Sequence, residues 1–159
     1  MSIGVKKVTF TITCADPRLN FAAAHFIVDH EKCGRLHGHN YFLSVTVEGS
    51  LDEQGMVLDY GILKKTIKAM LDPLDHHVLV PKQAKDLVIH ETENEVELRT
   101  KNKRLLLPKE EVIFLPLPST TSELLAKYFH DKIAHRWPEY HFSITIEEAP
   151  GASATYSQI

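Results

Sequence analysis

The chain has 159 residues, of which 43% are hydrophobic and 25% are charged, and its formal net charge at pH 7 is −3. This composition is that of a single folded domain over residues 1–159, and it excludes a disordered chain, which would have fewer apolar residues and a larger net charge. The mild acidity argues against a protein that coats nucleic acid or an anionic membrane, so neither is expected as a partner.

Ten histidines accompany only two cysteines, Cys14 and Cys33, so we expect no disulfide framework and at least one thiol available for chemistry. No apolar run approaches the roughly 18 residues that a membrane-spanning helix needs. Lys6 and Lys7 lead into a short alternating run at residues 8–12 instead of the long apolar stretch of a secretory signal. A soluble, cytoplasmic protein is therefore expected.

The first half of the chain is expected to form two strands and a helix. Residues 8–12 and 41–48 alternate apolar with polar side chains and are rich in β-branched or aromatic residues, which predicts strands. After a loop, Asp59 is placed to cap a helix that Pro73 ends. The apolar residues of this helix recur at a spacing of three and four: Ile62, Leu63, Ile67, Met70 and Leu71.

The second half repeats a helix and strands. Residues 119–123 supply hydroxyl caps and a carboxylate ahead of a second amphipathic helix, and residues 140–147 and 151–156 are expected to be strands. Between the halves, residues 78–119 contain short apolar runs that we interpret as one or two inserted β-hairpins. The order predicts an α+β fold, with an antiparallel sheet packed against helices.

A candidate metal site lies in the segment around His37-Gly38-His39. In an extended strand, residues two apart point to the same face, so these two imidazoles can converge, and His25 offers a third. Zinc held by three histidines keeps a fourth position open, as catalytic sites do, although copper, nickel and iron also accept imidazole. The alternative is that the pair only forms a half-exposed polar face.

The remaining histidines are assigned to ordinary structural roles. His77, next to His76, is expected to be structural. Five others are expected to be solvated on helix, strand or loop surfaces: His30, His90, His130, His135 and His141.

Cys33 precedes the histidine pair and is a candidate fourth metal ligand, nucleophile or general base. Neighbouring cations, including Lys32 and Arg35, favour the thiolate form that such chemistry requires. A buried, inert cysteine fits this polar segment less well, whereas Cys14 fits that description. Asp75 and His76 form a second candidate, because a carboxylate beside a histidine can orient the ring and stabilise its protonated form.

These motifs resemble the 6-pyruvoyl-tetrahydropterin synthase and 6-carboxy-tetrahydropterin synthase family. The resemblance implies that His25, His37 and His39 bind Zn²⁺. It implies further that Cys33 is the catalytic thiol and that Asp75 with His76 is its acid/base partner. The matching segments, in chain order, are residues 21–25, 33–39, 55–59, 74–77, 121–123 and 146–149.

The resemblance also implies how substrate is held. Glu148 matches the glutamate that anchors the guanidine-like edge of the pterin ring, and a carboxylate can accept two parallel hydrogen bonds there. Glu147 is the neighbour that an alignment slip of one residue would select. Thr120 and Thr121 resemble the hydroxyl pair that helps to hold the pterin.

The family fold is the tunnelling fold, a four-stranded antiparallel sheet with two helices on one face. It assembles into oligomeric barrels, usually a homohexamer built as a dimer of trimers, so the resemblance implies active sites between subunits. Residues 78–119 depart from the short family members as an insertion, which could line the substrate entrance or extend an oligomer contact.

The implied substrate is 7,8-dihydroneopterin triphosphate. The spacing of Cys33 and His37 and the string at residues 74–77 resemble the carboxy-forming branch of the family more than the pyruvoyl branch. The resemblance implies a lyase that releases triphosphate and acetaldehyde and leaves 6-carboxy-5,6,7,8-tetrahydropterin for 7-deazaguanine synthesis. Alternatives are a 6-pyruvoyl-tetrahydropterin synthase, an aldolase-like member that yields a hydroxymethyl pterin, and a pterin- or metal-binding module without turnover.

Overall fold

The computed structural model describes residues 9–158, so Lys6, Lys7 and Val8 lie outside the described residues. Ten strands, two α-helices and two short 3-10 turns are found in this range. In chain order they are β1 (Phe10–Cys14), β2 (Asn20–His25), β3 (His37–Gly49), α1 (Tyr60–Leu71), η1 (Asp72–Leu74), β4 (His77–Pro81), β5 (Val88–Glu91), β6 (Glu95–Thr100), β7 (Lys103–Pro108), η2 (Lys109–Glu111), β8 (Val112–Leu115), α2 (Ser122–Arg136), β9 (His141–Ala149) and β10 (Ala152–Ser157).

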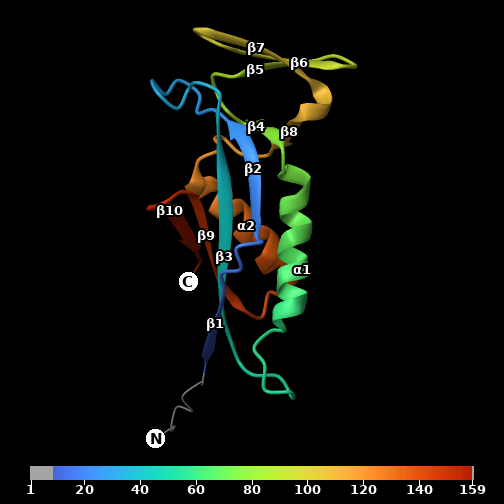
Figure 1. Cartoon of the computed structure of the whole chain (residues 1–159), viewed down its shortest axis with the longest axis vertical. Helices are drawn as coiled ribbons and strands as arrows, with labels where there is room; N and C mark the ends of the chain where they lie inside the picture. The colour runs from blue at the N-terminus through green and yellow to red at the C-terminus, as the bar shows by residue number, and fades with distance from the viewer. Residues whose placement is uncertain (1–8, 159) are drawn as a thin grey trace, which may run out of the picture.

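Seven of the strands form the main sheet, in the order β10-β9-β3-β2-β4-β8 with β1 paired to β3 (Figure 1). The 13-residue strand β3 pairs with β2 over its first residues and with β1 over its last. The pairs from β10 to β2 are antiparallel, whereas β2–β4 and β4–β8 are parallel. Strand β2 therefore joins the antiparallel part of the sheet to the parallel part.

Both helices cover the same face of this sheet. One core cluster contains inward residues of β3 and β9, such as Leu43 and Ile144, together with Ile67 of α1 and Phe129 of α2. The alternate residues of the same strands, including Ser44 and Thr145, face the other way. No helix among residues 9–158 is both long and apolar enough to cross a membrane.

The two helices begin where the capping residues predict. The Asp59 carboxylate accepts the Ile62 N–H at 2.8 Å, and α1 continues until Pro73 follows it in η1. Thr121 caps α2, its hydroxyl accepting the N–H of Leu124. The strands predicted near residues 41–48, 140–147 and 151–156 are also present as β3, β9 and β10.

The main sheet is larger than the four antiparallel strands that the resemblance implied. The ends of segment 78–119 form β4 and β8, which extend the main sheet in parallel. Only its middle part forms the antiparallel hairpins that the short apolar runs predict, namely the three-stranded sheet β5-β6-β7. The run from Val78 to Pro81 is buried throughout, so it lacks the alternation that marks a half-exposed strand.

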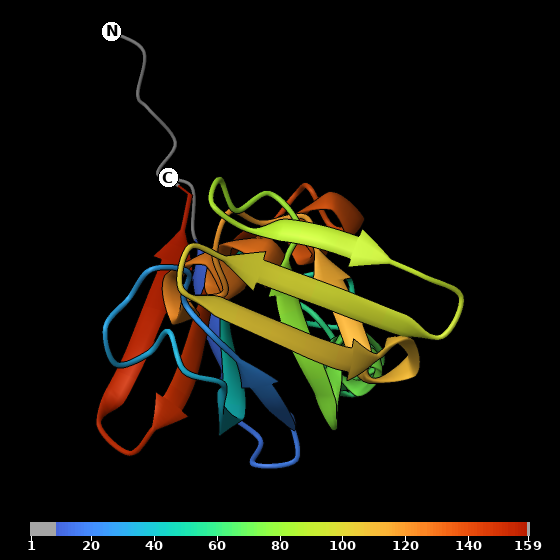
Figure 2. The same cartoon turned by 90° about the horizontal axis from the view of Figure 1, so that it is seen from above.

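The three-stranded sheet, which we call the β5–β7 sheet, lies across one end of the molecule, above the loop that joins β2 to β3 (Figures 1 and 2). Its inner face forms a second core cluster, in which Val96 and Leu98 are packed with Phe26, Val78 and Val80. The insertion is therefore part of the folded domain and shares a core with the end of β2.

His130 was expected on the surface, and this expectation is wrong. Its side chain is buried because α2 turns it toward β10, where the imidazole lies edge-on to the Tyr156 ring with 4.8 Å between centroids. The imidazole Nδ1 also lies 3.2 Å from a carboxylate oxygen of Asp131. An apolar aromatic contact, together with one polar partner, accounts for the burial.

Two isoleucines of α1 test which face supports the fold. Ile67 is fully buried and Ile62 is 52% exposed, so truncation to alanine removes the same atoms in two environments. We expect Ile67→Ala to lower the free energy of unfolding by about 2–5 kcal/mol and Ile62→Ala by under about 1 kcal/mol. Urea unfolding at a fixed protein concentration measures both, and equal losses would contradict the packing described above.

Candidate metal centre and substrate cavity

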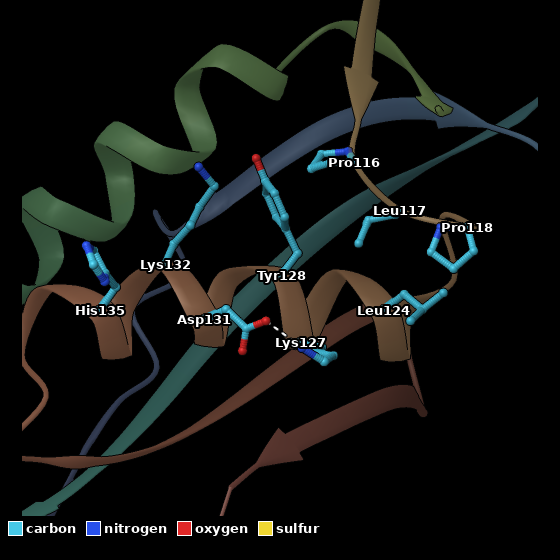
Figure 3. A pocket seen from close by; sticks show the side chains of 9 residues that line it. All are labelled: Pro116, Leu117, Pro118, Leu124, Lys127, Tyr128, Asp131, Lys132 and His135. Atoms are coloured by element: carbon cyan, nitrogen blue, oxygen red, sulfur yellow. Dashed lines mark hydrogen bonds and ion pairs between the residues drawn. The ribbon is translucent and has the colours of Figure 1, made fainter. Parts of the chain in front are cut away.

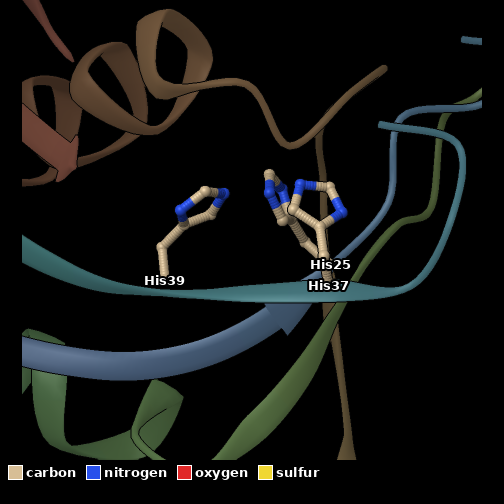
Figure 4. Close-up of side chains that lie close together, drawn as sticks. All are labelled: His25, His37 and His39. Carbon is tan, nitrogen blue, oxygen red and sulfur yellow. The ribbon is translucent and has the colours of Figure 1, made fainter. Parts of the chain in front are cut away.

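Three histidines converge on the helix-covered face of the sheet. The antiparallel pairing of β2 with β3 sets His25 opposite His37, and His39 lies two residues farther along the same face of β3. The metal-binding atoms that the three side chains offer all lie within 4.8 Å of one another (Figure 4). That spacing lets one cation contact all three imidazoles.

The hydrogen bonds of His25 and His37 each use the Nδ1 atom and leave Nε2 for a metal ion. His25 donates its Nδ1–H to the carbonyl of Thr120 at 3.0 Å, and its buried Nε2 has no hydrogen-bond partner among residues 9–158. His37 likewise donates Nδ1–H to the carbonyl of Arg35 at 2.7 Å. Metal-binding imidazoles are commonly oriented in this way, with the other ring nitrogen held by a carbonyl. The residues present therefore fit a bound metal ion.

Burial keeps the central imidazole in its metal-binding form. His25 is 2% exposed, and its burial, reinforced by the nearby His37, lowers the pKa of the His25 ring to about 4. The ring is thus neutral at pH 7, as a ligand must be. The Tyr41 ring packs edge-on against His25 and His39, with centroid separations of 5.9 and 5.5 Å. Tyr41 supports the cluster from the core side.

A cavity of about 570 Å³ joins the histidines to other candidate residues. Its lining includes the three histidines, Cys33 from the β2–β3 loop, Thr121 and Ser122 from the start of α2, and Glu148 from β9. The cavity therefore brings together three segments that are far apart in sequence, residues 25–39, 121–123 and 148–154, around the possible metal position. It offers imidazole, thiol, hydroxyl and carboxylate groups to one ligand.

Glu148 is held at the N-terminus of α2. The Ser122 hydroxyl donates a hydrogen bond to its Oε2 at 2.6 Å, and the start of a helix stabilises a negative charge. Glu147 points to the other face of the sheet, where it lines a hollow with Phe42 and Ser44. Between the two neighbouring glutamates, Glu148 is the one at the cavity. Ser122 is a site residue that the sequence reasoning missed.

The two threonines lie differently. Thr120 is fully buried, and besides its carbonyl bond to His25 its hydroxyl lies 3.4 Å from the Phe26 carbonyl, to which it donates. Thr121 caps α2 and lines the cavity. Thr120 thus contacts a candidate metal ligand, and only Thr121 lies where a ligand in the cavity would reach it.

Asp75 and His76 are not brought to this cavity in a single chain. His76 lines a separate hollow of about 450 Å³ together with Ala22, Ala24 and Gly38. These three residues alternate along β2 and β3 with the histidines, so they face the other side of the sheet. The Asp75 carboxylate accepts the Ala22 N–H at 2.8 Å and lies 2.9 Å from His76 Nδ1. The Ala22 N–H, more than His76, lowers the pKa of Asp75.

His76 has a backbone conformation that side chains rarely adopt. Its φ is +61°, in the left-handed region, and its N–H is bonded to the Ala22 carbonyl at 2.6 Å. The imidazole is 82% exposed. Backbone groups of Ala22 in β2 therefore position Asp75 and His76, and the His76 imidazole extends into solvent.

His30, expected to be an ordinary surface residue, is exposed but lines the cavity. Its Nδ1 accepts the N–H of Cys33 at 3.0 Å, so it shapes the turn that carries the thiol. Its sequence position three residues before Cys33 gave no signal of this contact.

A larger hollow lies elsewhere and lacks these features. It measures about 610 Å³ and lies beside α2, where Pro116, Leu117 and Tyr128 form much of its wall (Figure 3). Of its charged residues, Lys127 and Asp131 pair with each other, and Lys132 lies over the Tyr128 ring. None of the candidate metal, thiol or carboxylate residues lines it.

The chain is similar to known pterin enzymes. The family model described as 6-pyruvoyl tetrahydropterin synthase matches residues 16–158. A protein of Methanocaldococcus jannaschii named putative 6-carboxy-5,6,7,8-tetrahydropterin synthase is 36% identical over 145 residues, which cover 87% of this chain and 89% of that protein. The 6-carboxy-5,6,7,8-tetrahydropterin synthase of Haemophilus influenzae is 29% identical over 145 residues, covering 87% and 94%.

Solved structures give the same answer for the fold. The 6-pyruvoyl tetrahydropterin synthase of Plasmodium falciparum superimposes with a TM-score of 0.87 at 26% identity, covering 94% of this chain and 98% of that one. The Plasmodium vivax enzyme gives 0.88 at 24% identity, covering 96% and 99%. The family match over nearly all of the described residues and the shared α+β fold lead to one conclusion: the chain belongs to the 6-pyruvoyl tetrahydropterin synthase family.

Proposed function

We propose that the chain is a zinc-dependent lyase that converts 7,8-dihydroneopterin triphosphate to 6-carboxy-5,6,7,8-tetrahydropterin, acetaldehyde and triphosphate. The observation that carries this proposal is the meeting of three imidazoles, a thiol and a carboxylate in one cavity. The names of the two sequence relatives favour the carboxy product over a pyruvoyl product. The product would then serve 7-deazaguanine synthesis in the cytoplasm.

In this proposal, the residues of the cavity have three roles: metal binding, proton transfer and binding of the pterin ring. Zinc bound by His25, His37 and His39 supplies Lewis acidity toward the hydroxyls of the substrate side chain. Cys33, as a thiolate, takes a proton from that side chain. Glu148 accepts two hydrogen bonds from the guanidine-like edge of the pterin ring, while the hydroxyl of Ser122 holds its carboxylate in place.

The charge distribution of the cavity supports one orientation of the substrate. Glu147 pairs with Phe42, so Glu148 lies level with Tyr41, about 13 Å along β3 from His37. Beyond His37, the β2–β3 loop brings the basic residue Lys32 to the lining. A molecule with its guanidine-like edge at Glu148 and its side chain at the histidines thus carries its triphosphate toward Lys32.

The Asp75–His76 pair enters the proposal through a second copy of the chain. In one chain the pair lies on the face opposite Cys33, and the His76 imidazole is 82% exposed. We propose a homohexamer, a dimer of trimers, in which His76 of one copy faces Cys33 of its neighbour and Asp75 supports the protonated imidazole. His76 then relays protons to the substrate.

Product identification tests the reaction. Incubation of the purified, zinc-loaded protein with 7,8-dihydroneopterin triphosphate should yield acetaldehyde and a carboxypterin, identified by mass spectrometry. Cys33→Ala should lower turnover by about 10²-fold or more, because it removes the proton acceptor. The structural control is Cys14→Ala, at a buried cysteine outside the cavity. A pyruvoyl or hydroxymethyl product would replace the proposed reaction, and full activity of Cys33→Ala would refute the catalytic role of Cys33. No turnover by the wild-type protein would favour a binding module.

Metal content tests the ligand set. The purified protein should contain about one zinc ion per chain, and His37→Ala should lower the zinc retained after dialysis about tenfold or more. His90→Ala, at an exposed histidine of β5, is the matched control and should retain zinc fully. Elemental analysis by plasma mass spectrometry gives the readout. Retention of the full zinc content by His37→Ala would refute the ligand assignment.

Complementation tests whether two copies share a site. Cys33→Ala and His76→Ala should each be nearly inactive, but subunits of the two variants mixed in one oligomer should recover about a quarter of the wild-type activity. The recovery arises because about one site in four then combines an intact Cys33 with an intact His76 from a neighbour. Sites built within single chains would recover nothing, so an inactive mixture of proven hybrid oligomers would contradict the shared site.

A further inference from the structure

The β2–β3 loop, residues 26–36, carries Cys33 and is shaped by its own hydrogen bonds. The Cys33 carbonyl accepts the Ile27 N–H at 2.8 Å, and the Cys33 N–H donates to His30 Nδ1. The Gly34 N–H is bonded to the His30 carbonyl at 2.9 Å. A Cβ at Gly34 would lie 2.2 Å from that same oxygen, so only glycine fits this turn. The loop conformation therefore determines where the thiol lies.

Thr120 and His37 donate hydrogen bonds to the two ends of this loop, at the Phe26 and Arg35 carbonyls, and one residue of the β5–β7 sheet bonds to its middle. Lys103, the first residue of β7, donates from Nζ to the Gly34 carbonyl at 2.7 Å. The same ammonium lies 5.3 Å from the centroid of the Phe26 ring, a cation–π distance at the start of the loop. Lys103 thus contacts both ends of the turn that carries Cys33, although it lies 69 residues from Gly34 in sequence.

Apolar packing places Lys103 accurately. Phe26 is 1% exposed and is packed with Val96 and Leu98 of β6, while Val28 and Leu105 pack against the same cluster. On the outer face of this sheet, Glu97 pairs with Arg99 of its own strand and with Arg104 of β7, and the second pair links β6 to β7. The β5–β7 sheet is therefore held by apolar packing on its inner face and by ion pairs on its outer face, next to the loop.

We propose that Lys103 is a positioning residue for Cys33, and that the β5–β7 sheet holds the 26–36 loop in the conformation that presents the thiol to the cavity. Lys103 itself is not one of the residues that line the cavity. Its effect on catalysis passes through the Gly34 carbonyl. The catalytic consequence rests on the proposed function of Cys33, whereas the effect on the loop does not.

The test compares three variants of the full-length protein. Lys103→Met keeps an unbranched stem but loses the donor, and Lys103→Arg keeps a cationic donor. Lys101→Met changes an exposed lysine in the turn between β6 and β7 and is the matched control. The first readout is the rate at which iodoacetamide modifies Cys33, measured by peptide mass spectrometry, with the buried Cys14 as the internal reference. The second is amide hydrogen exchange of residues 27–35.

Lys103→Met should raise both the Cys33 modification rate and the exchange of the loop about tenfold, since a charge-assisted bond no longer keeps the loop closed. Its kcat should fall about tenfold while KM changes less than about twofold, because the pterin anchor at Glu148 is untouched. Lys103→Arg should recover most of both effects, and Lys101→Met should match the wild type.

Two other outcomes are decisive in different ways. If Lys103→Met lowers the melting temperature but leaves Cys33 modification and loop exchange unchanged, Lys103 only stabilises the fold and the proposal is wrong. If the loop effects appear while Cys33→Ala retains full turnover, the positioning of Cys33 stands and the proposed catalytic function fails.

Discussion

The register between β2 and β3 is the constraint on which the candidate site depends. It places His25 directly across from His37, and a slip of one residue would turn the imidazole of His25 to the opposite face of the sheet. The stacked rings of Phe21 and Tyr41, 4.9 Å apart, belong to the same register and anchor it in the core. The buried Nε2 of His25 has no hydrogen-bond partner among residues 9–158, which costs free energy that a metal ion at this position would offset. Core packing therefore holds the ring in a position that a metal completes.

The two faces of the sheet carry chemistry of different kinds. On the helix-covered face, the histidines lie at a cavity with a largely polar lining, next to the apolar core. The face that carries Asp75 and His76 is open, and its pair is held by backbone groups of β2. Ala22 bonds to Asp75 and His76, and His25, three residues later on the same strand, belongs to the histidine cluster. A distortion of β2 would disturb the acid/base pair and the metal ligands together.

Local patterns were sufficient to predict much of this structure. The caps at Asp59 and Thr121 and the convergence of His37 with His39 follow from contacts between residues close in sequence, where spacing determines geometry. The family resemblance, and no spacing rule, pointed to Glu148. The bond from Ser122 to Glu148 spans 26 residues and depends on how α2 docks onto β9, which no local pattern encodes. The same holds for the buried side of α2, for the parallel strands β4 and β8, and for the face that Asp75 occupies.

The parallel pairing of β4 with β8 sets a lower limit on the length of the inserted segment. Adjacent parallel strands cannot be joined by a tight turn, because the chain leaves one strand at the end opposite to where it must enter the next. The β5–β7 sheet is thus the crossover connection of the main sheet, a role that a helix commonly fills. From β8 the chain runs through Leu117, whose carbonyl accepts the N–H of Gln83, to Thr120, whose carbonyl holds His25. Deletion of the β5–β7 sheet, with only a short turn left in its place, would pull β8 out of its register with β4 and shift Thr120. The length of the inserted segment is therefore coupled to the orientation of the buried His25 imidazole.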